Sequence, residues 1–297
     1  MSERITIKDV PLEELVITPG SACQGCGAAL AARLAFKALG PNTIRHSIPA
    51  CPDNVTRTPT SGGEFEAGGD HVTGTWRGLK AIGREDVQVV GFYGDGGVYD
   101  IGFQSISGAA IRNENVLIIC KNNEAYMNTG GQVSGATPLL AMTTTTPVGP
   151  MSRGKPYNRK NTPMIFAMHG VPYVATASIA FPTDLIAKVQ YTKKVRGFKF
   201  IDIQTPCPTG WRFDPSKTIE VARLAVQTGF WPLYEIIDGR KFRLNYKPRE
   251  LKPVGEYLKL QGRFRHLTED EIEEIQRGVT EYWERLLKLD ERGEFIF

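Results

Sequence analysis

Residues 87–112 read VQVVGFYGDGGVYDIGFQSISGAAIR and contain a predicted strand, a tight turn and a helix in immediate succession. The apolar, β-branched run 87–93 is typical of a buried strand. Gly94-Asp95-Gly96-Gly97 predicts the turn, and residues 100–112 predict the helix. Glycines let a backbone approach a phosphate closely, and the free N–H groups of a helix N-terminus favour an anion. The stretch therefore predicts a phosphate-binding turn.

A second polar turn follows the next predicted strand, residues 115–120, and reads Lys121-Asn122-Asn123-Glu124. Ligands of open parallel sheets bind at the carboxyl ends of strands, so the two turns are expected to meet there. Asp95 would offer a carboxylate oxygen and the second turn an amide oxygen. Mg²⁺ takes few such protein oxygens and keeps the phosphates of its ligand as partners. A lone Gly-Asp-Gly predicts only a turn, but the pair predicts a phosphate-binding site with Mg²⁺.

Strands and helices alternate along most of the chain. The predicted strands cover residues 43–48, 87–93, 115–120, 172–177 and 198–204. The predicted helices cover residues 28–39, 69–82, 100–112 and 182–195. This rhythm predicts an α/β fold, with a mostly parallel sheet and helices on both faces.

Residues 128–160 interrupt this pattern. They are rich in Gly, Thr, Pro and Ser and have no apolar period. So long a loop within a compact domain is usually functional or mobile. We expect Lys155, Arg159 and Lys160 in it to be solvated, with contact to a phosphate or to coenzyme A as the alternative.

The chain after Trp231 is expected to form an extended basic arm and a final helix. Thr268 and Glu271 form a capping box at the start of that helix. Nine Lys or Arg residues and two Glu residues lie between positions 240 and 265, which fits either a solvated face or contact with a partner. We predict a cofactor domain over residues 1–235, and an arm with a helix over 236–297 that packs on partner subunits.

Four of the five cysteines form an unusual pattern. Cys23 and Cys26 are a close pair among small residues, whereas Cys51 and Cys207 stand alone beside prolines. Iron–sulfur clusters need thiolates that converge without bulky neighbours, and this pattern favours such a cluster. Structural zinc is the alternative, although zinc sites typically use two close pairs. Cys120 ends an apolar strand and is expected to be a core thiol.

Composition excludes several classes of protein. The formal net charge of +4 over 297 residues is too small to indicate nucleic-acid binding. Residues 1–4 are charged and do not start a signal peptide, and no apolar run has the length of a membrane helix. We expect a cytoplasmic protein, in whose reducing surroundings Cys-x-x-Cys is a metal or redox site rather than a disulfide.

Together these motifs resemble the β subunits of 2-oxoacid:ferredoxin oxidoreductases, typified by pyruvate synthase. The resemblance covers nearly the whole chain. It is carried by CQGCG at 23–27, the isolated Cys51, GDGG at 94–97, NEAYMNTGGQ at 123–132, TPCP at 205–208 and YLKLQGRF at 257–264.

The resemblance implies a thiamine diphosphate-binding fold and a specific set of site residues. Asp95, the Asn123 side chain and the Ala125 carbonyl would hold Mg²⁺, and Asn128 would lie near the substrate. The residues expected to bind thiamine diphosphate are Gly94, Asp95, Gly96, Gly97, Asn123, Ala125 and Tyr126. The four cysteines expected to hold one 4Fe–4S cluster are Cys23, Cys26, Cys51 and Cys207.

The implied activity is oxidative decarboxylation of a 2-oxoacid with coenzyme A, with electrons passing through the cluster to ferredoxin. Thiamine sites are built between two domains, so the resemblance also implies an α subunit, γ and δ subunits or fused equivalents, and a dimer of heteromers. Pyruvate is the first expected substrate, and 2-oxoisovalerate, 2-oxoglutarate and oxalate are alternatives. A non-redox thiamine carboligase or decarboxylase would leave the cysteines unexplained, and a metal-bearing scaffold would leave the glycine turn unexplained.

Overall fold

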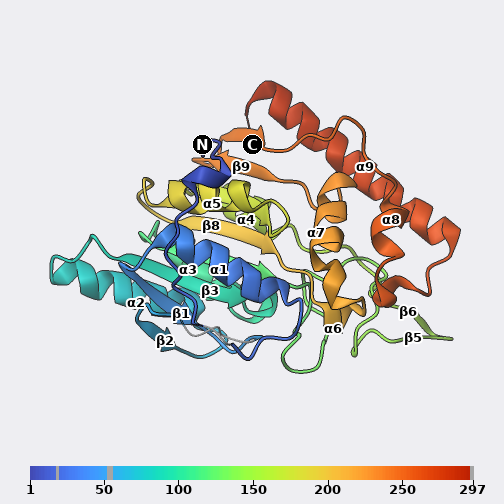
Figure 1. Cartoon of the computed structure of the whole chain (residues 1–297), viewed down its shortest axis with the longest axis horizontal. Helices are drawn as coiled ribbons and strands as arrows, with labels where there is room; N and C mark the ends of the chain where they lie inside the picture. Colours follow the sequence, from blue (N-terminus) through green and yellow to red (C-terminus); the bar gives the residue numbers. More distant parts are fainter. Residues whose placement is uncertain (18–19, 52–55, 295–297) are drawn as a thin grey trace.

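The computed structural model describes residues 1–17, 20–51 and 56–294, and these fold around one eight-stranded sheet (Figure 1). The strand order is β10-β9-β7-β8-β4-β3-β1-β2. The parallel strands are β1 (Thr43–Ser47), β2 (Thr60–Gly62), β3 (Gln88–Gly94), β4 (Leu117–Asn122), β7 (Tyr173–Ser178) and β8 (Lys199–Gln204). All five predicted strands are present, with ends that differ by at most two residues, so the predicted α/β fold is confirmed.

Helices cover both faces of the sheet. On one face, α1 (Gly27–Leu39) packs beside α5 (Pro182–Thr192). On the other face lie α2 (Gly68–Ala81), α3 (Phe103–Ile111) and α4 (Thr162–Met168). Successive residues of a strand point to opposite faces, so Val89 and Val90 in β3 belong to two different apolar cores. The sheet is therefore buried on both sides, as its apolar strands require.

The turn after β3 differs from the predicted single helix. A π-helical turn, η2 (Gly96–Ile101), precedes α3, and the Gly102 amide donates to the Gly97 carbonyl at 2.9 Å. Such turns often occur at functional sites. A Cβ atom on Gly102 would lie 2.6 Å from that same carbonyl, so the tight turn needs glycine there.

The segment after Trp231 is not an extended arm at its start. The strands β9 (Tyr234–Ile237) and β10 (Lys241–Leu244) form an antiparallel pair that continues the sheet beside β7. The pair crosses the predicted domain boundary at residue 235, and that division stays a prediction. The continuous sheet explains why these residues order within this chain.

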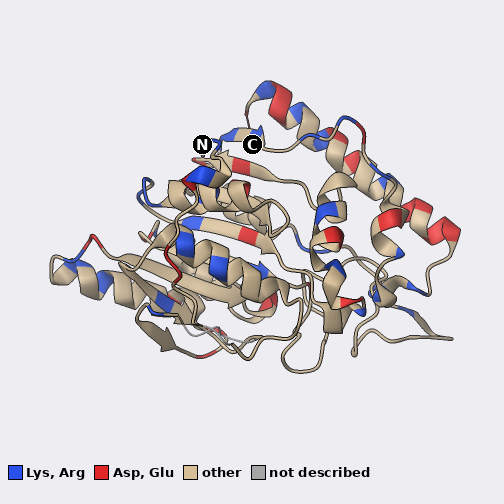
Figure 2. Cartoon of the chain, viewed as in Figure 1, with Lys and Arg blue, Asp and Glu red and all other residues tan. Residues whose placement is uncertain are grey.

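Two helices follow, α8 (Val254–Leu258) and α9 (Glu269–Arg292), and they pack against each other. The predicted capping box of α9 is confirmed: the Thr268 hydroxyl accepts from the Glu271 amide at 3.3 Å, and the Glu271 carboxylate accepts from the Thr268 amide at 2.8 Å. Trp283 and Leu286 bury the apolar stripe of α9 within this chain. Its outer face carries charges of both signs (Figure 2), and packing of this helix on partner subunits stays a prediction.

Shorter elements complete the chain. They are η1 (Ile7–Asp9), β5 (Val148–Gly149), β6 (Ser152–Arg153), α6 (Pro208–Trp211), η3 (Pro215–Lys217), α7 (Thr218–Gln227) and η4 (Gly262–Phe264). A third apolar core lies among α7, α8 and α9. Among the described helices, none combines the length and apolarity needed to cross a membrane.

Candidate active site

Asp95 occupies the turn at the carboxyl end of β3 and is fully buried. Its Oδ2 accepts from the Ser134 hydroxyl at 2.6 Å, and its Oδ1 accepts from the backbone amide of Asn123 at 3.2 Å. Burial nevertheless raises the pKa of Asp95 to about 8. A carboxylate with this little compensation needs a cation beside it to stay charged.

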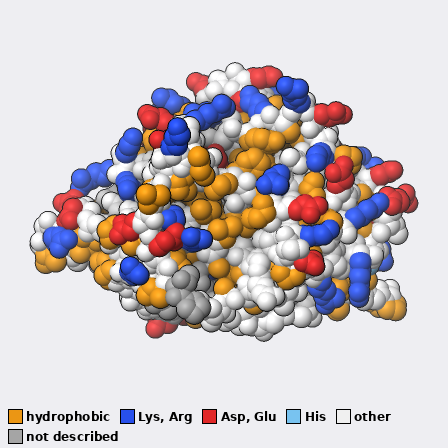
Figure 3. Space-filling view, in the orientation of Figure 1, with side chains coloured by type: hydrophobic (Ala, Val, Ile, Leu, Met, Phe, Trp, Pro, Cys, Tyr) orange, Lys and Arg blue, Asp and Glu red, His pale blue; other side chains and the backbone are white. Residues whose placement is uncertain are grey.

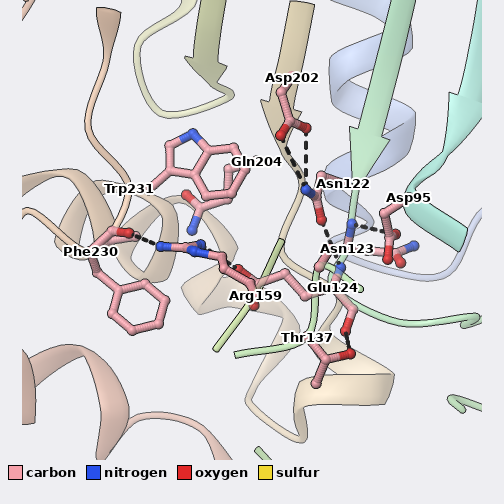
Figure 4. A network of polar contacts seen from close by, with 12 residues as sticks. Asp95, Asn122, Asn123, Glu124, Thr137, Arg159, Asp202, Gln204, Phe230 and Trp231 are labelled. Carbon is pink, nitrogen blue, oxygen red and sulfur yellow. Dashed lines mark hydrogen bonds and ion pairs between the residues drawn. The ribbon is translucent and has the colours of Figure 1, made fainter. Parts of the chain in front are cut away.

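The turn after β4 meets the turn after β3 at Asp95, and Figure 4 shows Asn123 beside Asp95. One end of the Asn123 side-chain amide lies 2.9 Å from the Ala125 carbonyl oxygen and 3.0 Å from Asp95 Oδ1. If that end is the NH₂ group, it donates to both oxygens. If it is the oxygen, three oxygens converge, which is the donor set that Mg²⁺ takes. The residues therefore fit the cation that the sequence predicts.

The glycine turn is held closely by aromatic and aliphatic side chains. The Tyr126 hydroxyl donates to the Gly96 carbonyl at 3.1 Å, and a Cβ on Gly96 would lie 2.5 Å from the Tyr126 ring. A Cβ on Gly97 would lie 2.2 Å from Ile48. Phe65 packs edge-on against Tyr126, with 5.7 Å between the ring centroids. Any side chain at either glycine would displace these neighbours.

Asn128 lies on the turn that follows Tyr126, and its side chain is exposed. The turn closes through hydrogen bonds from Tyr126 N to Gln132 O, 3.0 Å, and from Gly131 N to Tyr126 O, 2.9 Å. Asn128 is therefore exposed on the turn that follows Tyr126, while its role near a substrate stays a prediction.

The four predicted cluster cysteines lie on three segments of the chain that approach one another. The Gly27 amide donates to the Pro206 carbonyl at 3.2 Å, which sets Cys26 beside Cys207. Burial raises the pKa of the Cys51 thiol to about 12, and the nearby Cys207, Cys26 and Cys23 act in the same direction. All four thiols are free, and Cys23 is exposed.

Glycines allow these segments to approach one another closely. A Cβ on Gly27 would lie 2.7 Å from the Pro206 carbonyl oxygen, and a Cβ on Gly25 would lie 2.4 Å from that of Pro215. The Cys207 sulfur accepts from the Gly210 amide at 3.3 Å, which is the kind of hydrogen bond that clusters use. Within the described ranges, no three His, Cys, Asp or Glu side chains are spaced to hold a single metal ion.

The cysteine turn touches the predicted magnesium turn directly. The Trp211 indole N–H, four residues after Cys207, donates to the Asn123 carbonyl at 2.8 Å. A Cβ on Gly210 would lie 2.2 Å from the sulfur of Met127. The two candidate sites are thus neighbours, joined through one buried indole.

Comparison with known proteins shows which sequences and structures this chain is similar to. Residues 73–203 match the family model described as thiamine pyrophosphate enzyme, C-terminal TPP binding domain. The chain is 50% identical over 278 residues to pyruvate synthase subunit PorB of Methanothermobacter thermautotrophicus, covering 91% of this chain and 96% of that protein. It is 43% identical to ketoisovalerate oxidoreductase subunit VorB of Pyrococcus furiosus, covering 98% and 97%.

This chain belongs to the β-subunit family of the 2-oxoacid:ferredoxin oxidoreductases. A solved 2-oxoglutarate:ferredoxin oxidoreductase from Magnetococcus marinus matches with a TM-score of 0.58 at 23% identity, covering 75% of this chain and 84% of that one. At that identity the match supports the fold. The predicted family, fold and enzyme class are confirmed.

Sequence reasoning missed the buried ion pair that supports the Asn123 turn in this β subunit. Glu124 is fully buried and has a left-handed backbone, with φ of 62°. Its carboxylate accepts from Arg263 at 2.5 Å, and Arg159 lies 3.5 Å away. The Arg263 guanidinium also lies 3.8 Å from the Trp211 ring centroid. Neighbours distant in sequence thus hold a strained residue, as often happens at functional sites.

A second buried network, which includes Asn122 and Asp202, lies next to the predicted magnesium turn (Figure 4). The side-chain NH₂ group of Asn122 donates to the Tyr99 hydroxyl and to the Asp202 carboxylate, each at 3.2 Å. The Tyr99 hydroxyl in turn donates to Asp202 at 2.5 Å. Burial raises the pKa of Asp202 to about 6. The other end of the Asn122 side chain accepts from the Glu124 amide at 3.1 Å, which fixes the turn.

The prediction that Lys155 is solvated is wrong. Lys155 is fully buried, and its ammonium group donates to the Ser134 and Thr137 carbonyls at 3.2 and 2.5 Å. Arg159 and Lys160 are also largely covered, and they donate to the Phe230 and Tyr99 carbonyls. The loop 128–160 is therefore built into the site, because its lysines satisfy carbonyls that lie away from water.

Proposed function

We propose that this β subunit carries the thiamine diphosphate, Mg²⁺ and one 4Fe–4S cluster of an enzyme that oxidatively decarboxylates pyruvate with coenzyme A. The observation that carries the proposal is the contact between the two candidate sites through Trp211 and Asn123. An electron that leaves the substrate carbon needs an acceptor within a short distance. Adjacent sites meet this requirement.

In this proposal the residues of the chain bind and orient the cofactors. Asp95, Asn123 and Ala125 would hold the cation against the diphosphate, and Gly96 and Gly97 would let the backbone approach it. Thiamine diphosphate supplies the electron sink that decarboxylation of a 2-oxoacid requires. Burial around Asp95 excludes water and strengthens the electrostatic hold on the cation.

The four cysteines would hold the cluster as thiolates, and Asn128 would lie beside the substrate. Hydrogen bonds to sulfur and burial tune the potential of such clusters. The Gly210 amide at the Cys207 sulfur provides one such bond. Electrons would then leave to ferredoxin.

The names of the relatives support pyruvate as the substrate without excluding other 2-oxoacids. The methanogen relative at 50% identity is named a pyruvate synthase subunit, and the Pyrococcus relative at 43% a ketoisovalerate oxidoreductase subunit. A relative from Aromatoleum evansii, 40% identical over 90% of this chain, is named a phenylglyoxylate dehydrogenase subunit. Residues on a partner chain would complete the choice of substrate.

We propose an α subunit, γ and δ subunits or fused equivalents, and ferredoxin as the partners, in a cytoplasmic dimer of heteromers. The face drawn in Figure 3 shows hydrophobic side chains gathered across its middle, with charged side chains around them. An exposed apolar surface of this kind is typical of a subunit contact.

The test is to purify the complex under anoxic conditions. We expect a brown preparation, with iron and thiamine diphosphate, whose visible absorbance bleaches on addition of pyruvate and coenzyme A. Reduction of viologen or ferredoxin over a panel of 2-oxoacids identifies the substrate, and another acid turning over faster than pyruvate would overturn that part. A colourless preparation that still decarboxylates would indicate a carboligase-type enzyme, and a colourless one that contains zinc would indicate a scaffold.

A further inference from the structure

A short turn at residues 134–137 contacts both halves of the predicted magnesium site. The Ser134 hydroxyl donates to Asp95 Oδ2 at 2.6 Å. The Thr137 hydroxyl donates to the backbone carbonyl of Glu124 at 2.6 Å, as Figure 4 shows. One turn thus bonds the carboxylate after β3 and the residue that follows Asn123 after β4.

The directions of both hydroxyl protons follow from the other contacts of this turn. The Ser134 hydroxyl oxygen accepts from the Ala136 amide at 3.2 Å, and the Thr137 hydroxyl oxygen accepts from the Ser134 amide at 2.9 Å. A hydroxyl group has one proton, and carboxylate and carbonyl oxygens only accept. Both protons therefore point at the predicted magnesium site, to Asp95 and to the Glu124 carbonyl.

Lys155 holds this turn from within the protein. Its side chain is fully buried, and its ammonium group donates to the carbonyls of Ser134, Gly135 and Thr137 at 3.2, 3.4 and 2.5 Å. An ammonium group has three N–H donors, so one turn engages all of them. Lysine is rarely buried, because removing its charge from water costs much free energy unless partners compensate.

The backbone of Lys155 is also fixed. Its amide donates to the Ala141 carbonyl at 3.1 Å, and its carbonyl accepts from the Leu140 amide at 2.8 Å. The lysine side chain therefore ties the 134–137 turn to a neighbouring part of the same loop, and the position of the turn depends on that tie.

We propose that Lys155 is a positioning residue for the cation site: it holds the 134–137 turn so that the Ser134 hydroxyl fixes the Asp95 carboxylate before the cation binds. The inference rests on the proposed site for Mg²⁺ and thiamine diphosphate. A carboxylate that is already held in one orientation loses less conformational freedom on binding. Groups that orient a metal ligand through a hydrogen bond contribute roughly ten- to a hundredfold to the affinity.

The test measures Mg²⁺ binding by the purified complex, from which Mg²⁺ and thiamine diphosphate have been removed. Isothermal titration at saturating thiamine diphosphate gives the affinity, and thermal denaturation without cofactor gives the stability. Lys155→Met keeps the length of the side chain and removes its three donors. We expect this variant to bind Mg²⁺ about tenfold more weakly than the wild type.

Lys199→Met is the matched control. Lys199 is 3% exposed, and its ammonium group donates to the Asn115 side chain at 2.8 Å and to the Val195 carbonyl at 3.2 Å. It pairs with Leu117, at the opposite end of β4 from the predicted magnesium turn. Both variants lose a buried lysine, so both should melt at a lower temperature, but only Lys155→Met should lose affinity for Mg²⁺. Equal losses of affinity in the two variants would overturn the inference.

A double-mutant cycle with Ser134→Ala tests whether Lys155 acts through the Ser134 hydroxyl. Once that hydroxyl is absent, Lys155→Met should change the affinity by about twofold or less, because the two residues act on the same carboxylate. A tenfold loss that persists in the Ser134→Ala background would overturn the inference. If Lys155→Met does not assemble, Lys155→Gln takes its place in the cycle and the same comparison decides.

Two outcomes separate this inference from the proposed function. Unchanged Mg²⁺ affinity in Lys155→Met would overturn the inference and leave the proposed function standing. A wild-type complex that binds no Mg²⁺ together with thiamine diphosphate would overturn the proposed function itself.

Discussion

At the scale of single residues, the candidate site consists of polar groups whose burial makes sense only with a bound partner. Asp95 is fully buried, and two hydrogen bonds do not offset the cost of its charge. The Asn123 amide faces two oxygens at 2.9 and 3.0 Å. A cation at this point would turn an unfavourable cluster of oxygens into a binding site.

Asp95→Asn should therefore remove cation binding and leave the fold intact. Asparagine has the same shape but no charge, so we expect the affinity for Mg²⁺ with thiamine diphosphate to fall by at least about tenfold. The melting temperature without cofactor should not fall, because a buried charge is lost. Isothermal titration and thermal denaturation measure the two effects. Asp86→Asn, at the exposed Asp86, is the control and should bind normally.

The cysteines give a second prediction at this scale. Cys207→Ser and Cys51→Ser should each reduce the iron content of the complex and its reduction of ferredoxin, because serine replaces a soft thiolate ligand. Cys120→Ala should keep full iron, since Cys120 is fully buried in an apolar core of the sheet. Iron analysis and visible absorption measure the outcome. Full iron in both serine variants would rule out the assignment of these ligands.

At the scale of elements, the site depends on a segment far away in the sequence. The short helix η4 carries Arg263 to Glu124, and α6 carries Trp211 to the Asn123 carbonyl. Both contacts end on the turn that follows β4. Both η4 and α6 thus hold the predicted magnesium turn in place.

Arg263→Met should destabilise the protein by roughly 3–5 kcal/mol, because it leaves the buried Glu124 carboxylate with a weaker partner. Arg77→Met is the matched control: Arg77 also pairs with a buried glutamate, Glu114, but its own side chain is 57% exposed. That loss should cost much less, because water solvates and screens the exposed guanidinium. Denaturant titration compares the two, and equal losses would show that burial of the Arg263 pair contributes little.

At the scale of the whole molecule, a buried carboxylate ties the N-terminal residues to the edge of the sheet. Glu235 in β9 accepts from the Ser2 amide and from the Tyr173 hydroxyl in β7, both at 2.8 Å. It also accepts from Asn245 at 2.7 Å and pairs with Arg243 of β10. The Glu235 carboxylate therefore joins the N-terminal residues to the edge of the sheet.

This anion predicts how stability depends on pH. Burial alone would raise the pKa of Glu235, but Lys188, Asn245, Ser2 and Arg243 outweigh it and hold the pKa at about 2. The folded pKa lies below the unfolded value, so the stabilisation is present above about pH 4.5 and is lost as the pH falls toward 2. Its size is about 3 kcal/mol.

Glu235→Gln should remove this part of the acid sensitivity and lower stability at pH 7. Thermal denaturation from pH 7 to pH 3 compares the variant with the wild type, and the difference should narrow on the acid side. Glu269→Gln, at the exposed Glu269, is the control and should keep the wild-type slope. A constant difference between Glu235→Gln and wild type at every pH would contradict the assignment.

Local patterns in the sequence were sufficient to predict the strands of the sheet, the glycine turn and the capping box of α9. Each depends on neighbours within a few residues: apolar runs make strands, glycines permit the turn at Gly96, and Thr268 caps its own helix. The spacing of Gly94–Gly97 and Asn122–Asn123 also placed both turns at one sheet edge, because parallel strands end together.

Contacts between distant parts of the chain could be identified only from the tertiary structure. The burial of Lys121, Lys155 and Arg263 could not be predicted, because an isolated basic residue looks solvated until its partners are known. The strand pair β9–β10 was likewise missed, since a short basic strand has little apolar pattern. The sequence alone determined which chemical groups are present and which elements carry them. The tertiary structure decided which charges are removed from water and held beside the cysteines and Asp95, because the cost of burying a charge depends on neighbours that only the folded chain supplies.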